Sequence, residues 1–224
     1  MITLVALGLV AVAGGSVELV KELTRKATRA EAAAAMAKEI ASRWERLPAG
    51  QIFPATISYT SSAGTHLSAR LVGISPQASC NAAVTAGELA RLGVTGCKTM
   101  LRATYVDASG TLATTVGIGV LSVPASRQKT ASDNEPLPAV AALHAVGYTG
   151  TISAGFGDAQ RAAAGIRLVD AYLLLYTAGA TDGERGSAAG AETQFSDLGL
   201  GVMTAIERTL TSHPSPCTMK DIKC

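Results

Sequence analysis

The chain has 224 residues, of which 48% are hydrophobic and 16% are charged, with 23 glycines and few aromatic residues. This composition allows a buried core and excludes a disordered polyelectrolyte. Nineteen Lys and Arg residues against seventeen Asp and Glu residues leave a net charge of +2, too small to indicate a nucleic acid as partner. The length is that of one sizeable domain.

Residues 1–20 form an apolar segment, in which Ile2–Val17 precedes the first charged side chain, Glu18. We expect this segment to lie in a membrane, although it falls short of the roughly 20 apolar residues that span a bilayer core. Two alternatives stay open. Ala11–Ala13 resembles the small-residue cleavage site of a signal peptide, and the short length also suits a core helix of a soluble protein.

Residues 21–48 are rich in helix formers, and their apolar residues recur at helical spacing. They predict a stalk helix that continues the membrane segment and ends at Leu47–Gly50, where Pro and Gly follow. Residues 49–224 then make up the folded domain.

The next part of the chain alternates strands with helical sequence. Ile52–Tyr59 and Ser68–Ile74 carry β-branched residues around a short turn and predict a hairpin. Asn81–Leu92 is alanine-rich and predicts a helix. In Met100–Val123, two β-rich runs flank the turn sequence DASG, which predicts a second hairpin.

The last part predicts a helix over 137–146, a short helix over 158–164 that Asp158 caps, a buried strand over 171–177 and an amphipathic helix over 195–210. Hairpins interrupted by helices indicate an α+β fold. The expected architecture is an N-terminal membrane and stalk helix followed by a mainly antiparallel sheet covered on one face by helices.

Four cysteines, Cys80, Cys97, Cys217 and Cys224, fall into two pairs that are local in sequence. An even number without C-x-x-C spacing favours disulfides over a zinc or redox site, although the sequence leaves all three connectivities open. Disulfides place the domain outside the cytoplasm, on a protein that crosses the cell membrane once. The basic residues that follow the apolar segment argue for the opposite orientation.

No nucleophile elbow, phosphate loop or metal-ligand set is present in the sequence, and the histidines His66, His144 and His213 are scattered. The sequence therefore favours a non-enzymatic role and predicts no cofactor. An alternative is a ligand-sensing or enzymatic domain with a cleft between sheet and helices. The residues proposed to line that cleft are Arg102, Tyr105, Asp170 and Tyr172.

From Ile52 onward the chain resembles a group of uncharacterised actinobacterial membrane-anchored extracytoplasmic proteins. The resemblance is carried by IFPATISYT, Cys80 with Gly96–Cys97, LRATYVDASGTL, FGDAQR and AYLLLYTAGATDG. It implies an envelope location, assigns no activity and transfers no functional residue. Such proteins carry basic residues ahead of a full-length span, whereas this chain starts at the apolar run.

These observations predict a binding or scaffolding module, anchored by its N-terminal segment on the outer face of the cytoplasmic membrane. Its expected partner is another envelope protein, which contacts the sheet face or the polar loops.

Overall fold

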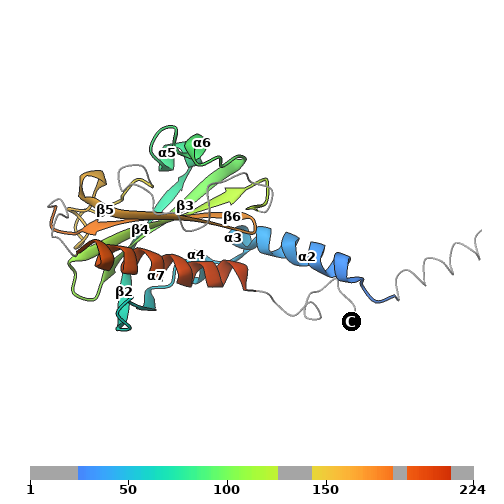
Figure 1. Cartoon of the computed structure of the whole chain (residues 1–224), viewed down its shortest axis with the longest axis horizontal. Helices are drawn as coiled ribbons and strands as arrows, with labels where there is room; N and C mark the ends of the chain where they lie inside the picture. The colour runs from blue at the N-terminus through green and yellow to red at the C-terminus, as the bar shows by residue number, and fades with distance from the viewer. Residues whose placement is uncertain (1–24, 126–142, 184–190, 213–224) are drawn as a thin grey trace, which may run out of the picture. The chain divides into compact units, whose positions relative to one another are not determined.

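A computed structural model of the chain describes residues 25–125, 143–183 and 191–212 (Figure 1). Contacts divide the chain into a main unit, Glu39–Ser212, and a second unit of which residues 25–38 are described. The main unit has an α+β fold with a curled, six-stranded sheet. The sheet is antiparallel throughout, as the sequence predicts.

The N-terminal helical sequence is interrupted and does not form one helix. Its described part comprises α2 (Arg29–Ala41), α3 (Arg43–Arg46) and α4 (Ala49–Ile52). Ser42 forms a turn between α2 and α3, and α3 ends at Arg46, next to the predicted end of the helix at Leu47–Gly50. Leu47 is extended before Pro48, because proline disfavours a helical residue ahead of it. Residues 1–24, with the apolar segment, lie outside the described residues.

The sheet has the order β1-β2-β3-β4-β6-β5. Its strands are β1 (Thr56–Thr60), β2 (His66–Ala78), β3 (Cys97–Asp107), β4 (Leu112–Leu121), β5 (Arg161–Val169) and β6 (Tyr172–Ala180). Both predicted hairpins are confirmed, as is the buried strand over 171–177, but the first strand begins at Thr56 and not at Ile52, which ends α4. In the β3–β4 turn Asp107 accepts hydrogen bonds from the main-chain N–H groups of Ser109 and Leu112, over 3.1 and 2.8 Å.

Three predicted helices differ in the structure. The helix expected over 81–92 is two short helices, α5 (Cys80–Ala83) and α6 (Glu88–Arg91), because Val84 is extended and Gly87, which precedes α6, takes a left-handed conformation with φ of 77°. Residues 158–164 form a 3-10 turn, Asp158–Gln160, and the start of β5, so the helix expected there was wrong. Arg161, Ala163 and Ala164 instead pair with the neighbouring strand β6.

The third difference concerns the helix predicted over 137–146. Residues 143–146 are not helical, and residues 137–142 lie outside the described part of the chain. Leu143 instead forms an isolated antiparallel bridge with Val84. The Leu143 side chain is fully buried against the sheet, in one cluster with apolar side chains of α5 and α6.

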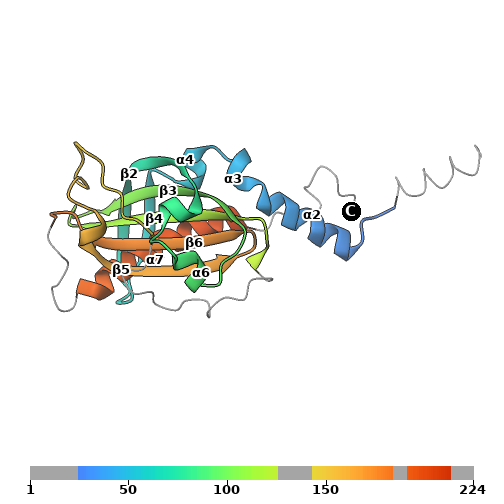
Figure 2. The same ribbon diagram turned by 90° about the horizontal axis from the view of Figure 1, so that it is seen from above.

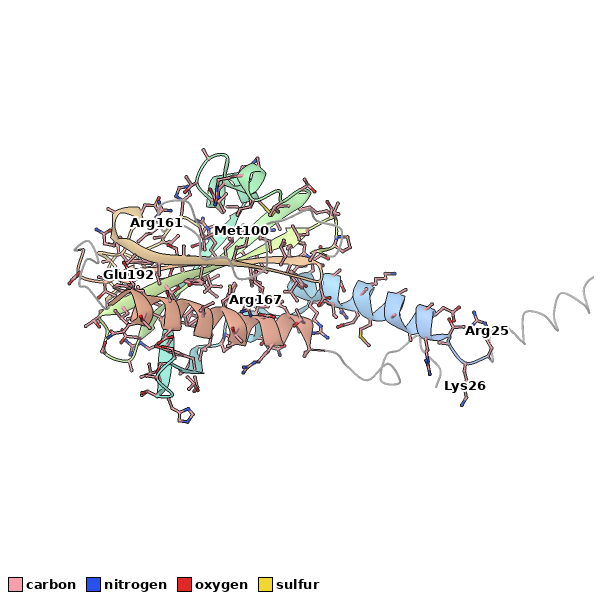
Figure 3. The ribbon with its side chains drawn as sticks, in the orientation of Figure 1. Arg25, Lys26, Met100, Arg161, Arg167 and Glu192 are labelled. Atoms are coloured by element: carbon pink, nitrogen blue, oxygen red, sulfur yellow. A yellow bond between two sulfur atoms is a disulfide. The ribbon has the colours of Figure 1, made fainter. Side chains whose placement is uncertain are left out.

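Elements cover both faces of the sheet, whereas the sequence predicts helices on one face only. Helix α7 (Ala191–Thr211) packs on one face, and α5 and α6 lie on the other (Figures 1 and 2). Met100 and Arg167 mark these opposite sides in Figure 3. The predicted apolar face of α7 is confirmed, since Leu198, Val202, Ile206 and Leu210 are completely buried.

This two-sided cover explains the continuous apolar sequence of β6, in which every residue from Tyr172 to Gly179 is buried.

Among the described residues, no helix is both long and apolar enough to cross a membrane.

Candidate functional site

The strand β1 lies at one edge of the sheet, and its outer side has no strand partner among the described residues. The Ser61 N–H donates to the Thr65 carbonyl, which fixes the hydrogen-bonding register of the hairpin. Because hydrogen-bonded pairs alternate along an antiparallel ladder, Ser58 and Thr60 direct their main-chain groups away from β2. Both residues are exposed. The edge therefore presents unpaired N–H and C=O groups.

A groove of about 390 Å³, here called the edge groove, lies between β1 and α7. One wall is the main chain and side chains of β1, and the other is one face of α7. Leu200, an apolar residue of that face, is 39% exposed. The groove is lined by Ser58, Tyr59, Thr60, Ser61, Ser62, Asp197, Leu200, Gly201, Thr204, Ala205 and Arg208.

A second hollow of about 630 Å³, here called the carboxylate bay, adjoins the edge groove. The two share four lining residues, Tyr59, Ser61, Ser62 and Asp197. The bay also takes in the β3–β4 turn and the first turns of α7. Its remaining lining residues are Ala63, Thr65, Leu67, Ser68, Asp107, Ala108, Ser109, Thr111, Leu112, Thr193 and Gln194.

Apolar side chains such as Leu67 and Leu112 line part of the bay, and its polar groups are mainly hydroxyls and two carboxylates, those of Asp107 and Asp197. Asp197 accepts from the Ser62 N–H over 3.1 Å and from the Ser62 hydroxyl over 3.0 Å, one bond to each carboxylate oxygen. These bonds tie the β1–β2 turn to α7. Each oxygen keeps a lone pair for a ligand, since a carboxylate has about four acceptor positions.

Tyr59 lies where the bay and the groove meet. The residue is only 8% exposed, because its ring packs against α7 at Gly201, where a β-carbon would lie 2.6 Å from the Tyr59 Cγ. Burial raises the pKa of its hydroxyl to about 12, and the negative charges of Asp107 and Asp197 add to the rise. Within the described part of the chain, that hydroxyl has no hydrogen-bond partner.

The structure does not bring the four residues of the predicted cleft together. Tyr105 and Tyr172 lie toward opposite ends of the α7 face of the sheet, and each is fully buried. The Tyr105 hydroxyl donates to the Pro54 carbonyl over 3.0 Å, and the Tyr172 hydroxyl donates to the Ile40 carbonyl over 2.5 Å. Both hydroxyls thus fasten the segment before β1 to the sheet.

Arg102 lies on the other face of β3, since it is three residues from Tyr105 and side chains alternate along a strand. Its Nε is buried and has no hydrogen-bond partner in the described parts of the chain. Asp170 occupies the β5–β6 turn with φ of 49°. It is exposed there.

A disulfide joins Cys80, at the start of α5, to Cys97, at the start of β3. Cys80 is 3% exposed and belongs to the core on the α5–α6 face of the sheet. The bond thus fixes α5 and α6 over that face. The other predicted disulfide residues, Cys217 and Cys224, lie outside the described residues.

The sequence did not indicate one polar pair, which His144 and Asp158 form. Asp158 does not cap a helix. It accepts from the Ala145 N–H over 2.8 Å, and its other oxygen lies 2.5 Å from the His144 Nδ1. These bonds hold the segment after residue 142 beside the start of β5. The side chains of both His144 and Asp158 are more than a third exposed.

The remaining histidines add no second polar cluster. His66 lies at the start of β2, where its Nδ1 is 3.3 Å from the Thr60 hydroxyl, and His213 is outside the described residues. In the described ranges, no group of three metal-ligating side chains occurs.

Comparisons with protein families, with curated proteins and with solved structures find no match to this chain.

Proposed function

We propose that this protein is a membrane-anchored, extracytoplasmic binding module that recruits an extended segment of a partner polypeptide along the free edge of β1. The observation that carries the proposal is the position of Ser58 and Thr60, whose outward main-chain groups border the edge groove. A peptide strand that adds to such an edge gains main-chain hydrogen bonds, while neighbouring pockets select its side chains. Exposed edges are otherwise a liability for aggregation.

The geometry of the edge groove suits an extended segment. Asp197 and Arg208 line it and are eleven residues apart on α7, a rise of about 16 Å along the helix axis. An extended peptide covers that length with about five residues. The groove also offers opposite charges along its length, so it favours one direction of a charged segment.

The location rests on two features. The apolar segment 1–20 and the helical sequence over 21–48 support a membrane anchor and a stalk. The Cys80–Cys97 disulfide supports an oxidising compartment, because disulfides persist outside the cytoplasm and are reduced within it.

The edge is tested by photo-crosslinking in intact cells. A photoreactive residue at Thr60 is expected to give a discrete adduct with a polypeptide, and the same probe at Asp170, in a distant turn, gives none. Ser58→Pro removes an outward N–H without breaking the ladder to β2, so it abolishes the adduct, whereas Ser58→Ala keeps it. An adduct that survives Ser58→Pro, or that forms equally from Asp170, contradicts the proposal.

The location is tested on protein purified from membranes without reductant. Peptide mapping by mass spectrometry is expected to recover Cys80 and Cys97 as one bridged pair. Two free thiols at these positions in freshly isolated protein would place the domain in a reducing compartment.

A further inference from the structure

We infer that the carboxylate bay binds a primary ammonium group, and that in the bound partner this group is the side chain of a lysine. This inference rests on the proposed function, since it names the chemistry by which the edge groove selects its segment. Asp107, Asp197 and the hydroxyl of Tyr59 all line the bay.

The bay is negatively charged. Among the described residues its lining contains two carboxylates and no Lys, Arg or His, so these residues give it a local charge of about −2 on a chain whose net charge is +2. Arg208 lines the edge groove but not the bay. Because the walls exclude part of the solvent, a cation is attracted there more strongly than on an open surface.

The bay also offers several acceptors. Tyr59 is the exceptional residue, because it is nine-tenths buried, lines both the bay and the groove, and its hydroxyl has no hydrogen-bond partner among the described residues. With the two carboxylates it supplies three acceptors from three elements, β1, β3 and α7. A lysine ammonium carries three donors on a compact charge.

The arrangement favours lysine over arginine. A guanidinium binds best through two parallel bonds to the free edge of one carboxylate. In Asp197 both oxygens already accept from Ser62, and in Asp107 both accept from the β3–β4 turn. A compact point charge needs only one remaining lone pair of a carboxylate, so it suits these partly occupied groups better.

The arrangement also disfavours a calcium ion. Calcium takes six to eight oxygen ligands, and several of these are usually carboxylates. The described residues of the bay offer only two carboxylates, Asp107 and Asp197.

The test uses the full chain in detergent micelles and follows backbone amide resonances during titration with N-acetyl-lysine methylamide. Three probes are compared: this compound, its Nε-acetylated analogue, and N-acetyl-arginine methylamide. The lysine probe is expected to shift the amide resonances of Ser62 and Asp197. It should bind about tenfold more tightly than either other probe, which is the difference in affinity that one hydrogen bond to a charged group makes.

Asp197→Asn is expected to weaken binding of the lysine probe about tenfold, because the neutral amide still accepts from Ser62 but loses the charge. Tyr59→Phe leaves both carboxylates in place and weakens it by a smaller factor. Asp170→Asn removes an equal charge in a distant turn and leaves binding unchanged. Equal affinity for the acetylated probe, tighter binding of the arginine probe, or binding that is insensitive to Asp197→Asn and Tyr59→Phe would overturn the inference.

The two proposals fail separately. If no probe shifts the bay resonances but the Thr60 adduct forms and is lost in Ser58→Pro, the ammonium inference falls and the edge proposal stands. If the lysine probe binds as expected but no adduct forms, the bay binds ammonium and the edge proposal falls.

Discussion

The guanidinium of Arg43 donates from Nη1 to the main-chain oxygen of Leu210 over 2.8 Å, and so joins the helical segment before the sheet to the end of α7. The same nitrogen lies 3.1 Å from the Ser212 hydroxyl. The last carbonyl groups of a helix lack partners and carry partial negative charge, so a buried cation there both satisfies and neutralises them. Arg43 is 7% exposed and forms an ion pair with Glu39 over 2.8 Å.

We expect Arg43→Met to lower the free energy of unfolding by about 3 kcal/mol, because it leaves the α7 carbonyls and part of the Glu39 charge unpaired in a buried site. Arg46→Met is the matched control. Arg46 also pairs with Glu39 over 2.8 Å, but its side chain is 55% exposed, so the loss stays below about 1 kcal/mol. Urea denaturation followed by circular dichroism measures both, and equal losses would show that Arg43 does not fasten α7.

The Glu39 carboxylate makes this stabilisation dependent on pH. Burial alone raises its pKa, but hydrogen bonds and charges from Arg43 and Arg46 outweigh burial and hold the pKa below the ordinary 4.5. Because the folded pKa is the lower one, the contribution is complete above the unfolded pKa and is lost as the pH falls through the folded value. The difference in unfolding free energy between wild type and Arg43→Met is therefore expected to shrink below about pH 4.5. A difference that is constant across this range would contradict the assignment.

Reduction of the Cys80–Cys97 disulfide is expected to lower the free energy of unfolding by about 3 kcal/mol, since the bond closes a loop of 17 residues. The double variant Cys80→Ser/Cys97→Ser should lose about as much without reductant, and adding reductant should then change nothing further at this bond. Thermal unfolding with and without dithiothreitol gives both values. A wild type that is insensitive to reductant would show that other contacts hold α5 and α6.

Gly199 and Gly50 offer a matched test of the packing of α7. Alanine normally stabilises a helix relative to glycine by about 1 kcal/mol. At Gly199 a β-carbon would overlap the ring of Tyr176, so Gly199→Ala is expected to destabilise the fold by about 1–3 kcal/mol. At Gly50, in α4, nothing lies within 4 Å, so Gly50→Ala should be neutral or stabilising. A stable Gly199→Ala variant would mean that α7 sits further from β6.

The alkaline titration of Tyr59 reports on the bay directly. Burial is the main cause of its raised pKa of about 12, so Asp197→Asn is expected to lower this value while leaving it above the ordinary 10.0. Since the folded pKa is the higher one, the neutral hydroxyl contributes stability below the unfolded pKa, and the contribution is lost as the pH rises through the folded value. NMR of tyrosine labelled at Cζ resolves this residue from the others. An unchanged Tyr59 pKa in Asp197→Asn would place the two groups too far apart to share a ligand.

Local sequence was enough to predict the strands whose patterns depend on near neighbours. The β3–β4 hairpin is specified by Asp107 and Gly110 at its turn, and α7 by an apolar face that repeats every three or four residues. The sequence failed over 158–164, where alanines and a capping Asp158 resemble a helix start. Pairing with β6 decides the structure there, and that partner cannot be seen in the segment itself.

The sequence by itself thus determined the α+β class, the antiparallel hairpins and the residues that α7 buries, because these follow from backbone preference and periodicity. Only the tertiary structure decided the site. Asp107, Asp197 and Tyr59 come from three elements and have unremarkable neighbours in the sequence, so the strand order and the packing of α7 bring them to one bay. Arg102 and Tyr105, by contrast, lie on opposite faces of β3 because side chains alternate along a strand, so their odd spacing already excluded a shared cleft. Contacts between distant segments depend on how faces are covered, and that is a property of the whole fold.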